Sequence, residues 1–150
     1  MRTYTIQIPP TLVTVAGGAR TLLQVTAGAV RSIRLLSAFL GQSGTTTNQQ
    51  VRIRILRKTV AATVTAFTPA PVEPGDSAFT GTSGNNATVE GTDGTTLAED
   101  VWSALSGWVY KPIPEEFIGA PGAGILAIKI PVALTADLTI EGYMTVQELG

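Results

Sequence analysis

The feature that most constrains the fold of this chain is a strict alternation of side chains near its C-terminus. Apolar or small residues occupy every second position, namely Leu138, Ile140, Gly142, Met144 and Val146. The intervening positions are held by Thr139, Glu141, Tyr143, Thr145 and Gln147. Because successive side chains of a strand point to opposite faces, a period of two predicts a β-strand with one face against a core.

The same period recurs along the chain, and no convincing helical window of 12 or more residues competes with it. Further strands are predicted at residues 3–8, 12–16, 20–26, 30–40, 51–58, 62–67, 88–90, 101–110 and 125–130. A helix is the alternative for 30–40, and the almost wholly apolar 125–130 is expected to be a central, buried strand. The 22 threonines suit a pleated surface, and the 16 glycines and 9 prolines mark frequent turns.

These segments predict one all-β domain spanning residues 1–150, an antiparallel β-sandwich of about eight or nine strands. The strand number, the long central loops and the closing C-terminal strand favour a jelly roll over an immunoglobulin-like order. Gly17-Gly18 suits a tight hairpin, and residues 41–49 and 69–96 read as loops. Residues 1–10, ended by a Pro-Pro pair, are either an N-terminal arm that reaches a neighbour or a plain edge strand.

Charge is segregated along the chain. Residues 1–72 carry eight basic and no acidic side chains, whereas residues 73–150 carry all 11 acids and two lysines. The halves have net charges of +8 and −9, which give the −1 of the whole chain. Either the charges pair across neighbouring strands of one subunit, or the particle has a basic and an acidic side that dock on partners. A nucleic-acid partner is not expected, since no aromatic residues interleave with the arginines.

The composition excludes most catalytic chemistry. The chain has no cysteine and no histidine, which removes thiol nucleophiles, cysteine-ligated zinc and histidine-based acid–base catalysis. We therefore expect neither an enzyme nor a cofactor or metal requirement. The catalytic alternative that this composition leaves open is a Ser-Lys pair drawn from Ser103 or Ser106 with Lys111 or Lys129.

Two groups of residues remain to be weighed as sites. The acidic stretch 90–100 has oxygen ligands that calcium accepts but lacks EF-hand spacing, so a solvated acidic loop is expected there. Trp102, Trp108 and Tyr110 fit a core or subunit interface better than a sugar platform. The N-terminal alternation lacks a signal-peptide core and no apolar stretch approaches the length of a membrane helix, so a chain made in the cytoplasm without a membrane partner is expected.

Four segments resemble a known family. VRIRILRK (51–58), PVEPGDSAF (71–79), WSALSGWVYKPIPEE (102–116) and LTIEGYMTVQELG (138–150) occur in an order similar to that of the small capsid decoration, or cement, proteins of tailed bacteriophages. The resemblance implies a virion structural protein that sits on the outer capsid surface, often as a homotrimer, with the major capsid protein as its partner. Such proteins bind after the shell expands and bridge neighbouring capsomers, which stabilises the mature lattice by mass action.

Under this hypothesis, side-chain patterning selects candidate contact residues. The candidates for contact with the capsid or another subunit are Arg2, Tyr4, Ile6, Ile8, Arg52, Arg54, Arg57 and Lys58. The candidates for a trimer interface are Trp108, Tyr110 and Phe117. The alternative function is a head-fibre, tail or fibre-tip module that binds a host glycan, and it requires Trp102 or Trp108 to be exposed in a cleft.

Overall fold

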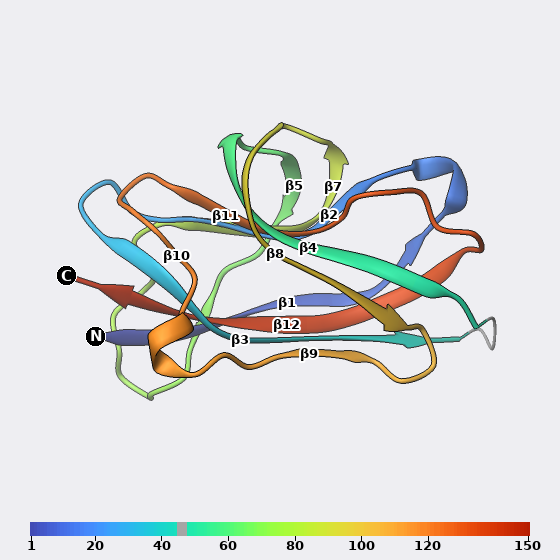
Figure 1. Ribbon diagram of the computed structural model, residues 1–150. Helices are drawn as coiled ribbons and strands as arrows, with labels where there is room; N and C mark the ends of the chain where they lie inside the picture. The colour runs from blue at the N-terminus through green and yellow to red at the C-terminus, as the bar shows by residue number, and fades with distance from the viewer. Residues whose placement is uncertain (45–47) are drawn as a thin grey trace.

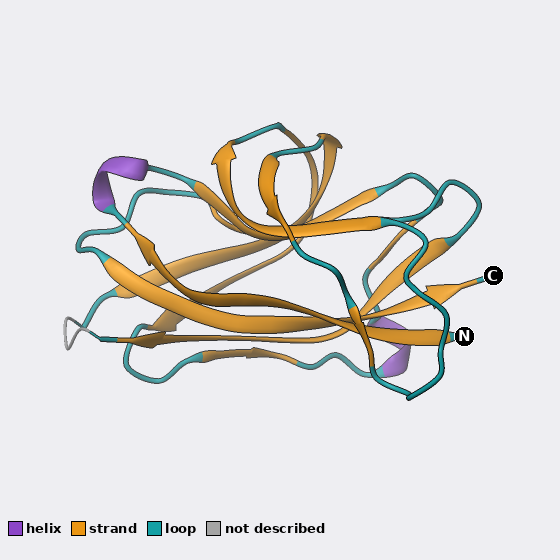
Figure 2. Cartoon of the chain, turned by 180° about the vertical axis from the view of Figure 1, so that it is seen from behind, coloured by secondary structure: helices purple, strands orange, loops and turns teal. Residues whose placement is uncertain are grey.

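The computed structural model describes residues 1–44 and 48–150 and consists of two antiparallel sheets stacked face to face (Figure 1). Strands make up 62% of the chain, and the described helical residues are two single 3-10 turns, η1 (Val15–Gly17) and η2 (Pro114–Glu116). The prediction of an all-β sandwich is confirmed, whereas the jelly-roll order stays a prediction. The cartoon from behind shows the two layers with loops at both ends (Figure 2).

The first sheet, here called sheet A, is built on long strands. Its order is β10 (Gly119–Ala120), β3 (Ser32–Ser43), β12 (Leu138–Leu149), β1 (Arg2–Val13) and β6 (Ala70–Pro71), and β9 (Trp108–Tyr110) also pairs with β3. β12 is paired along its length with β1 on one side and β3 on the other. The strand predicted from the C-terminal alternation is therefore the centre of a sheet, and β3 excludes the helical alternative for 30–40.

The N-terminal segment is a strand of this sheet and not an arm. Tyr4, Ile6 and Ile8 are completely or almost completely buried between the sheets. β1 also continues beyond the prolines that were expected to end it, with a register shift between Ile8 and Thr11. Proline cannot donate a ladder hydrogen bond, so the pairing skips these positions and resumes after them.

The second sheet, sheet B, has six strands. Their order is β5 (Thr63–Ala66), β7 (Thr82–Val89), β2 (Arg20–Thr26), β11 (Ile125–Ile130), β4 (Gln50–Val60) and β8 (Thr92–Ser103). β11 lies centrally between β2 and β4 and is buried on both faces, as its composition predicted.

Two local predictions are wrong, each for a different reason. The expected hairpin around Gly17-Gly18 is a crossover, because β1 and β2 belong to different sheets. The expected loop over 90–100 is mostly strand β8, which forms the edge of sheet B and is largely exposed on both faces. An edge strand with no buried face shows no apolar alternation, so its polar sequence was indistinguishable from a loop.

The main core lies between the sheets and draws on both. Tyr4, Leu40 and Met144 contribute from sheet A, and Leu22, Ile53 and Ile128 from sheet B. A fully buried side chain of this size stabilises a fold by about 1.5–3 kcal/mol.

Sheet B is also covered on its outer side. Gln24, Leu56 and Ala127 lie opposite one another in register. They face away from the main core, because Ala127 alternates with the core residues Leu126 and Ile128, yet all three are buried. The cover comes from β5, β7 and the adjoining ends of β4 and β8, which curl over the sheet (Figures 1 and 2). Gln24 holds this cover in place through two hydrogen bonds to Ala62. Its Oε1 accepts from the Ala62 N–H at 2.8 Å, and its Nε2 donates to the Ala62 carbonyl at 3.3 Å.

Candidate functional site

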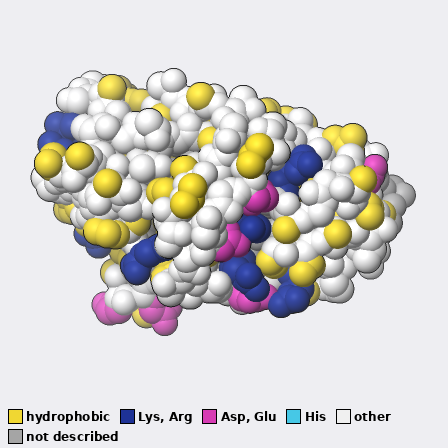
Figure 3. Space-filling model, turned by 90° about the horizontal axis from the view of Figure 1, so that it is seen from above, with side chains coloured by type: hydrophobic (Ala, Val, Ile, Leu, Met, Phe, Trp, Pro, Cys, Tyr) yellow, Lys and Arg dark blue, Asp and Glu magenta, His cyan; other side chains and the backbone are white. Residues whose placement is uncertain are grey.

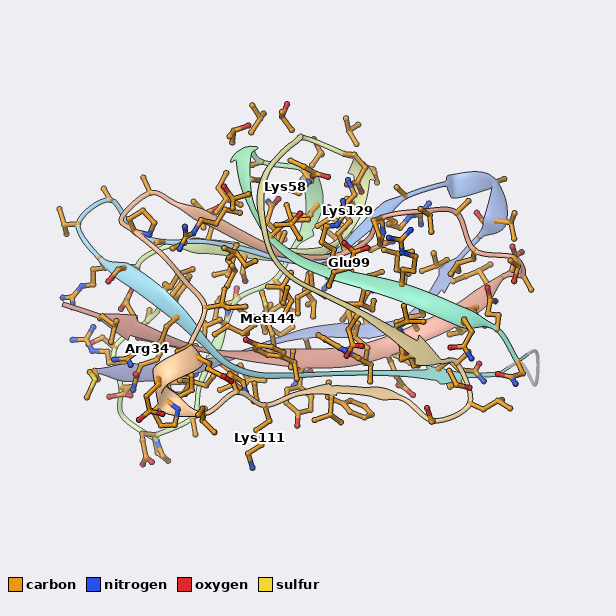
Figure 4. All side chains as sticks on the ribbon, in the orientation of Figure 1. Arg34, Lys58, Glu99, Lys111, Lys129 and Met144 are labelled. Carbon is orange, nitrogen blue, oxygen red and sulfur yellow. The ribbon has the colours of Figure 1, made fainter. Side chains whose placement is uncertain are left out.

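Under the curled strands, four charged side chains form a closed cluster on sheet B. Lys58 of β4 and Lys129 of β11 each donate a hydrogen bond of 2.7 Å to a different oxygen of Asp93 in β8. Both ammonium groups also lie near a carboxylate oxygen of Glu90, at 3.6 and 3.3 Å. Figure 4 shows Lys58 and Lys129 on the same side of the sandwich. The side chain of Lys58 is wholly buried, so these pairs hold the cover to the sheet.

The ionisation of this cluster follows from its contacts. Burial opposes the charge of Asp93, but hydrogen bonds from Lys129 and Lys58 outweigh it and hold the pKa of Asp93 below its usual value. Burial likewise opposes the charge of Glu90, yet hydrogen bonds from Thr21, at 2.5 Å from N–H and 2.7 Å from Oγ1, and the charge of Lys129 lower its pKa. Burial acts against the charge of Lys129, and its two acidic partners raise its pKa.

The prediction that Lys58 is a partner contact is therefore wrong. Register shifts between Ile55 and Leu56 and between Leu56 and Lys58 disturb the alternation of β4. The start of β8 then covers Lys58 and supplies its counter-ion. Glu90 and Asp93, considered above as calcium ligands, bind lysines, and the described residues contain no group of three acids placed to hold a metal ion.

Two of the three predicted arginines of β4, Arg52 and Arg54, are also paired within the chain. Glu99 of β8 accepts hydrogen bonds from Arg52 and, at 3.2 Å, from Arg54. Hydrogen bonding by Arg52 first, and then by Arg54, lowers the pKa of Glu99. Basic and acidic side chains consequently lie side by side on the face shown in Figure 3. For these residues, the interpretation in which the segregated charges pair across neighbouring strands is correct.

The predicted trimer-interface residues divide into one buried and two half-buried side chains. Trp108 is 4% exposed, donates a 3.0 Å hydrogen bond to Asp100 and stacks on Tyr110 with centroids 6.2 Å apart. Trp108 is thus a core residue, not an interface residue, because β9 folds back onto β3. Burial, followed by the charge of Glu116, raises the pKa of Tyr110. Phe117 is half-buried, with the Arg34 guanidinium 5.5 Å from its ring centroid.

The tryptophans do not form the exposed platform that a glycan site needs. Trp102 is also 4% exposed and lies in the main core. A pocket of about 190 Å³ opens between β8 and β9. Trp108 lines this pocket together with Ile53 and Ile55, but its side chain stays buried.

The outer face of sheet A carries a surface that sequence reasoning missed. Phe39 and Tyr143 lie opposite each other on β3 and β12, 36% and 41% exposed, with ring centroids 6.0 Å apart. Val109 of β9, 65% exposed, is paired with Phe39 and extends the row. We call Phe39, Tyr143 and Val109 the aromatic row. Beside it, a pocket of about 400 Å³ opens against Pro9 and Pro10.

One glycine allows this row to form. A Cβ at Gly142 would lie 2.0 Å from the carbonyl oxygen of Phe39, so a side chain there is incompatible with the close approach of β12 to β3. The sequence signal for the row was the position of Tyr143, which the alternation assigns to the solvent face of β12. Its partner Phe39 could not be found without the register of β3 against β12.

Comparison with protein-family models, curated proteins and solved structures yields no match to this chain. No helix within residues 1–44 and 48–150 is long and apolar enough to cross a membrane.

Proposed function

We propose that this protein decorates the outer surface of a bacteriophage capsid and stabilises the expanded shell by bridging neighbouring capsomers, as a homotrimer. The order of four sequence segments supports the proposal through their resemblance to decoration proteins. The proposal includes a location in the virion and the major capsid protein as the partner.

The observation that carries this proposal is the aromatic row on the bare face of sheet A. Exposed aromatic and aliphatic side chains that adjoin one another on a rigid face are typical of protein interaction sites. The three long strands beneath the row are hydrogen-bonded along their lengths, so the surface is preorganised and little ordering entropy opposes binding.

The mechanism is thermodynamic linkage. A protein that binds only the expanded lattice stabilises that lattice in proportion to its occupancy. Attachment through three copies of the same face adds avidity without new kinds of contact. Arg2 remains a candidate contact from the sequence, whereas Tyr4, Ile6 and Ile8 are committed to the core.

The test is addition of the purified protein to expanded shells that lack it and to unexpanded shells. We expect cosedimentation with expanded shells only, together with a higher disruption temperature of those shells. The F39S/Y143S double variant is expected to lose most of the binding, and Val60→Ser, which removes an exposed apolar side chain of sheet B, is the matched control. Equal binding by wild type and the double variant would refute the docking face, and absence of binding by wild type would refute the function.

A further inference from the structure

A second surface lies at the end of the sandwich that holds both termini (Figure 1). There a pocket of about 580 Å³ opens between the start of β3, β10, η2 and the end of β12. Its basic side chains are Arg34 and Arg57, and its apolar ones include Phe117 and Leu149. None of the described residues that line it is acidic.

The arginines of this pocket, Arg34 of β3 and Arg57 of β4, have no carboxylate partner among the described residues, whereas Arg52 and Arg54 share Glu99. Arg34 rests on Phe117, and its Nε is buried without a hydrogen-bond partner (Figure 4 labels Arg34). Arg57 donates from Nε to the carbonyl of Gly119 at 2.8 Å, which fixes the guanidinium at the pocket. Within the described part of the chain, neither forms an ion pair, in contrast to Arg52 and Arg54. Two fixed guanidinium groups beside apolar walls suit a carboxylate on an apolar segment.

The chain itself offers such a segment at the opposite edge of sheet A. Residues 72–76, Val-Glu-Pro-Gly-Asp, follow β6 and form a turn in which Asp76 N–H donates to the Glu73 carbonyl at 3.3 Å. Val72 is 51% exposed, and its N–H donates to the Thr3 carbonyl of β1 at 2.8 Å, which ties the turn to the sheet. Neither Glu73 nor Asp76 has an ion-pair partner among residues 1–44 and 48–150.

The pocket and the acidic turn lie at opposite ends of one line of paired residues that crosses sheet A. Arg34 is opposite Gln147, which is opposite Thr3. Arg34 also pairs with Gly119 of β10, and the Thr3 carbonyl accepts a hydrogen bond from Val72. This line of residues therefore ends in the pocket at one edge of the sheet and in the turn at the other. Four interstrand spacings separate β10 from β6, about 19 Å at the usual 4.8 Å each. The turn therefore cannot fill the pocket of its own chain.

We propose that the acidic turn 72–76 of one copy docks into the Arg34–Arg57 pocket of the next copy. Glu73 and Asp76 supply the carboxylates, and Val72 packs toward Phe117. Such a contact is heterologous, and three copies related by a threefold axis close it into a ring. The inference deepens the proposed function, since it rests on the self-association stated there, but its test needs no capsid.

Charge reversal tests the contact in solution. We expect wild type to have about three times the 15.6 kDa chain mass by light scattering after size exclusion. Arg57→Glu alone and Glu73→Lys alone are expected to lower that mass to one chain, and the R57E/E73K double variant to restore it. Lys111→Glu and Glu141→Lys make the same charge changes elsewhere and should leave the mass unchanged. A monomeric wild type, single variants that remain assembled, or a double variant that stays dissociated would each overturn the proposal.

Cross-linking gives an independent measurement, because the chain contains no cysteine. The P74C/P114C variant places one thiol on the turn and one on η2 beside the pocket, and it keeps both Glu73 and Asp76. A disulfide needs Cα atoms within about 7 Å, so the separation of the sheet edges forbids the bond within one chain. Oxidation of the double variant should give disulfide-linked oligomers up to a closed trimer and no larger. A mixture of the two single-cysteine variants should give linked dimers only. Absence of intermolecular bonds would refute the docking geometry.

The outcomes also separate this contact from the proposed function. If cross-linked rings form but do not bind shells, the contact between copies is supported and the decoration function is refuted. Shell binding by an Arg57→Glu variant whose mass equals that of wild type would retain decoration and refute the contact.

Discussion

The outer faces of the two sheets differ in how far they are covered and in how their polar and apolar side chains are partnered. The outer face of sheet B is covered by curled strands, and its charges are paired beneath or beside that cover by Asp93, Glu90 and Glu99. The outer face of sheet A leaves Phe39, Tyr143 and Val109 exposed as the aromatic row. Polar groups satisfied within the chain contribute to folding, whereas exposed apolar groups on a rigid sheet remain free for a partner. The difference ties stability to the outer face of sheet B, whereas the proposed binding uses the outer face of sheet A.

The largest change in stability is expected from breaking the charge cluster of sheet B. Asp93→Ala leaves Lys58 and Lys129 with only Glu90 between them, and removal of one partner from a buried pair costs about 3 kcal/mol. Urea unfolding measures the change in the free energy of unfolding. Glu141→Ala, which removes a carboxylate from sheet A, should change it by less than about 0.5 kcal/mol. Equal losses in the two variants would contradict the division between the faces.

A smaller loss is expected from Gly142→Ala on sheet A. The new Cβ would lie 2.0 Å from the Phe39 carbonyl oxygen, so β3 and β12 must move apart locally, at a cost of about 2 kcal/mol. The aromatic row should be disturbed at the same time, which the Tyr143 ring signals in an NMR spectrum would report. Unchanged ring signals together with unchanged stability would show that the row does not depend on this approach.

Acid should weaken sheet B selectively. The folded-state pKa values of Asp93 and Glu90 are lowered, so their contribution is fully present above their unfolded values of 3.8 and 4.5. It is lost as pH falls through the lower folded values, because the unfolded chain takes up protons first. Urea midpoints between pH 7 and pH 3 should therefore fall less in Asp93→Asn than in wild type. Parallel pH profiles of the two proteins would refute this linkage.

The sequence predicted those parts of the fold whose pattern is local. β12, β11 and most of β4 have faces that meet the core directly, so alternation or a continuous apolar run identified them. β8 has no buried face along most of its length and could not be distinguished from a loop. The burial of Lys58 depends on register shifts and on a cover contributed by β8, which no local pattern encodes.

The candidate surfaces were predictable to a similar degree. Alternation placed Tyr143 toward solvent, but its neighbour Phe39 depends on the pairing of β12 with β3, a contact between segments about a hundred residues apart. The segregation of charge was visible in the sequence. That Arg52 forms an ion pair with Glu99, whereas Arg57 donates to the Gly119 carbonyl, could be seen only in the structure.

The smallest effect on stability and the largest on binding are expected from the aromatic row. F39S/Y143S removes two side chains that are more than one-third exposed, so the free energy of unfolding should change by less than about 1 kcal/mol. Neither of the two side chains is a carboxylate, so the change should be the same at pH 7 and pH 3, unlike that of Asp93→Ala. Affinity for expanded shells should fall at least about tenfold, because each aromatic anchor at an interface contributes roughly 1–2 kcal/mol and tenfold corresponds to 1.4 kcal/mol. A large stability loss with unchanged shell affinity would reverse the comparison and make the face of sheet A a folding element.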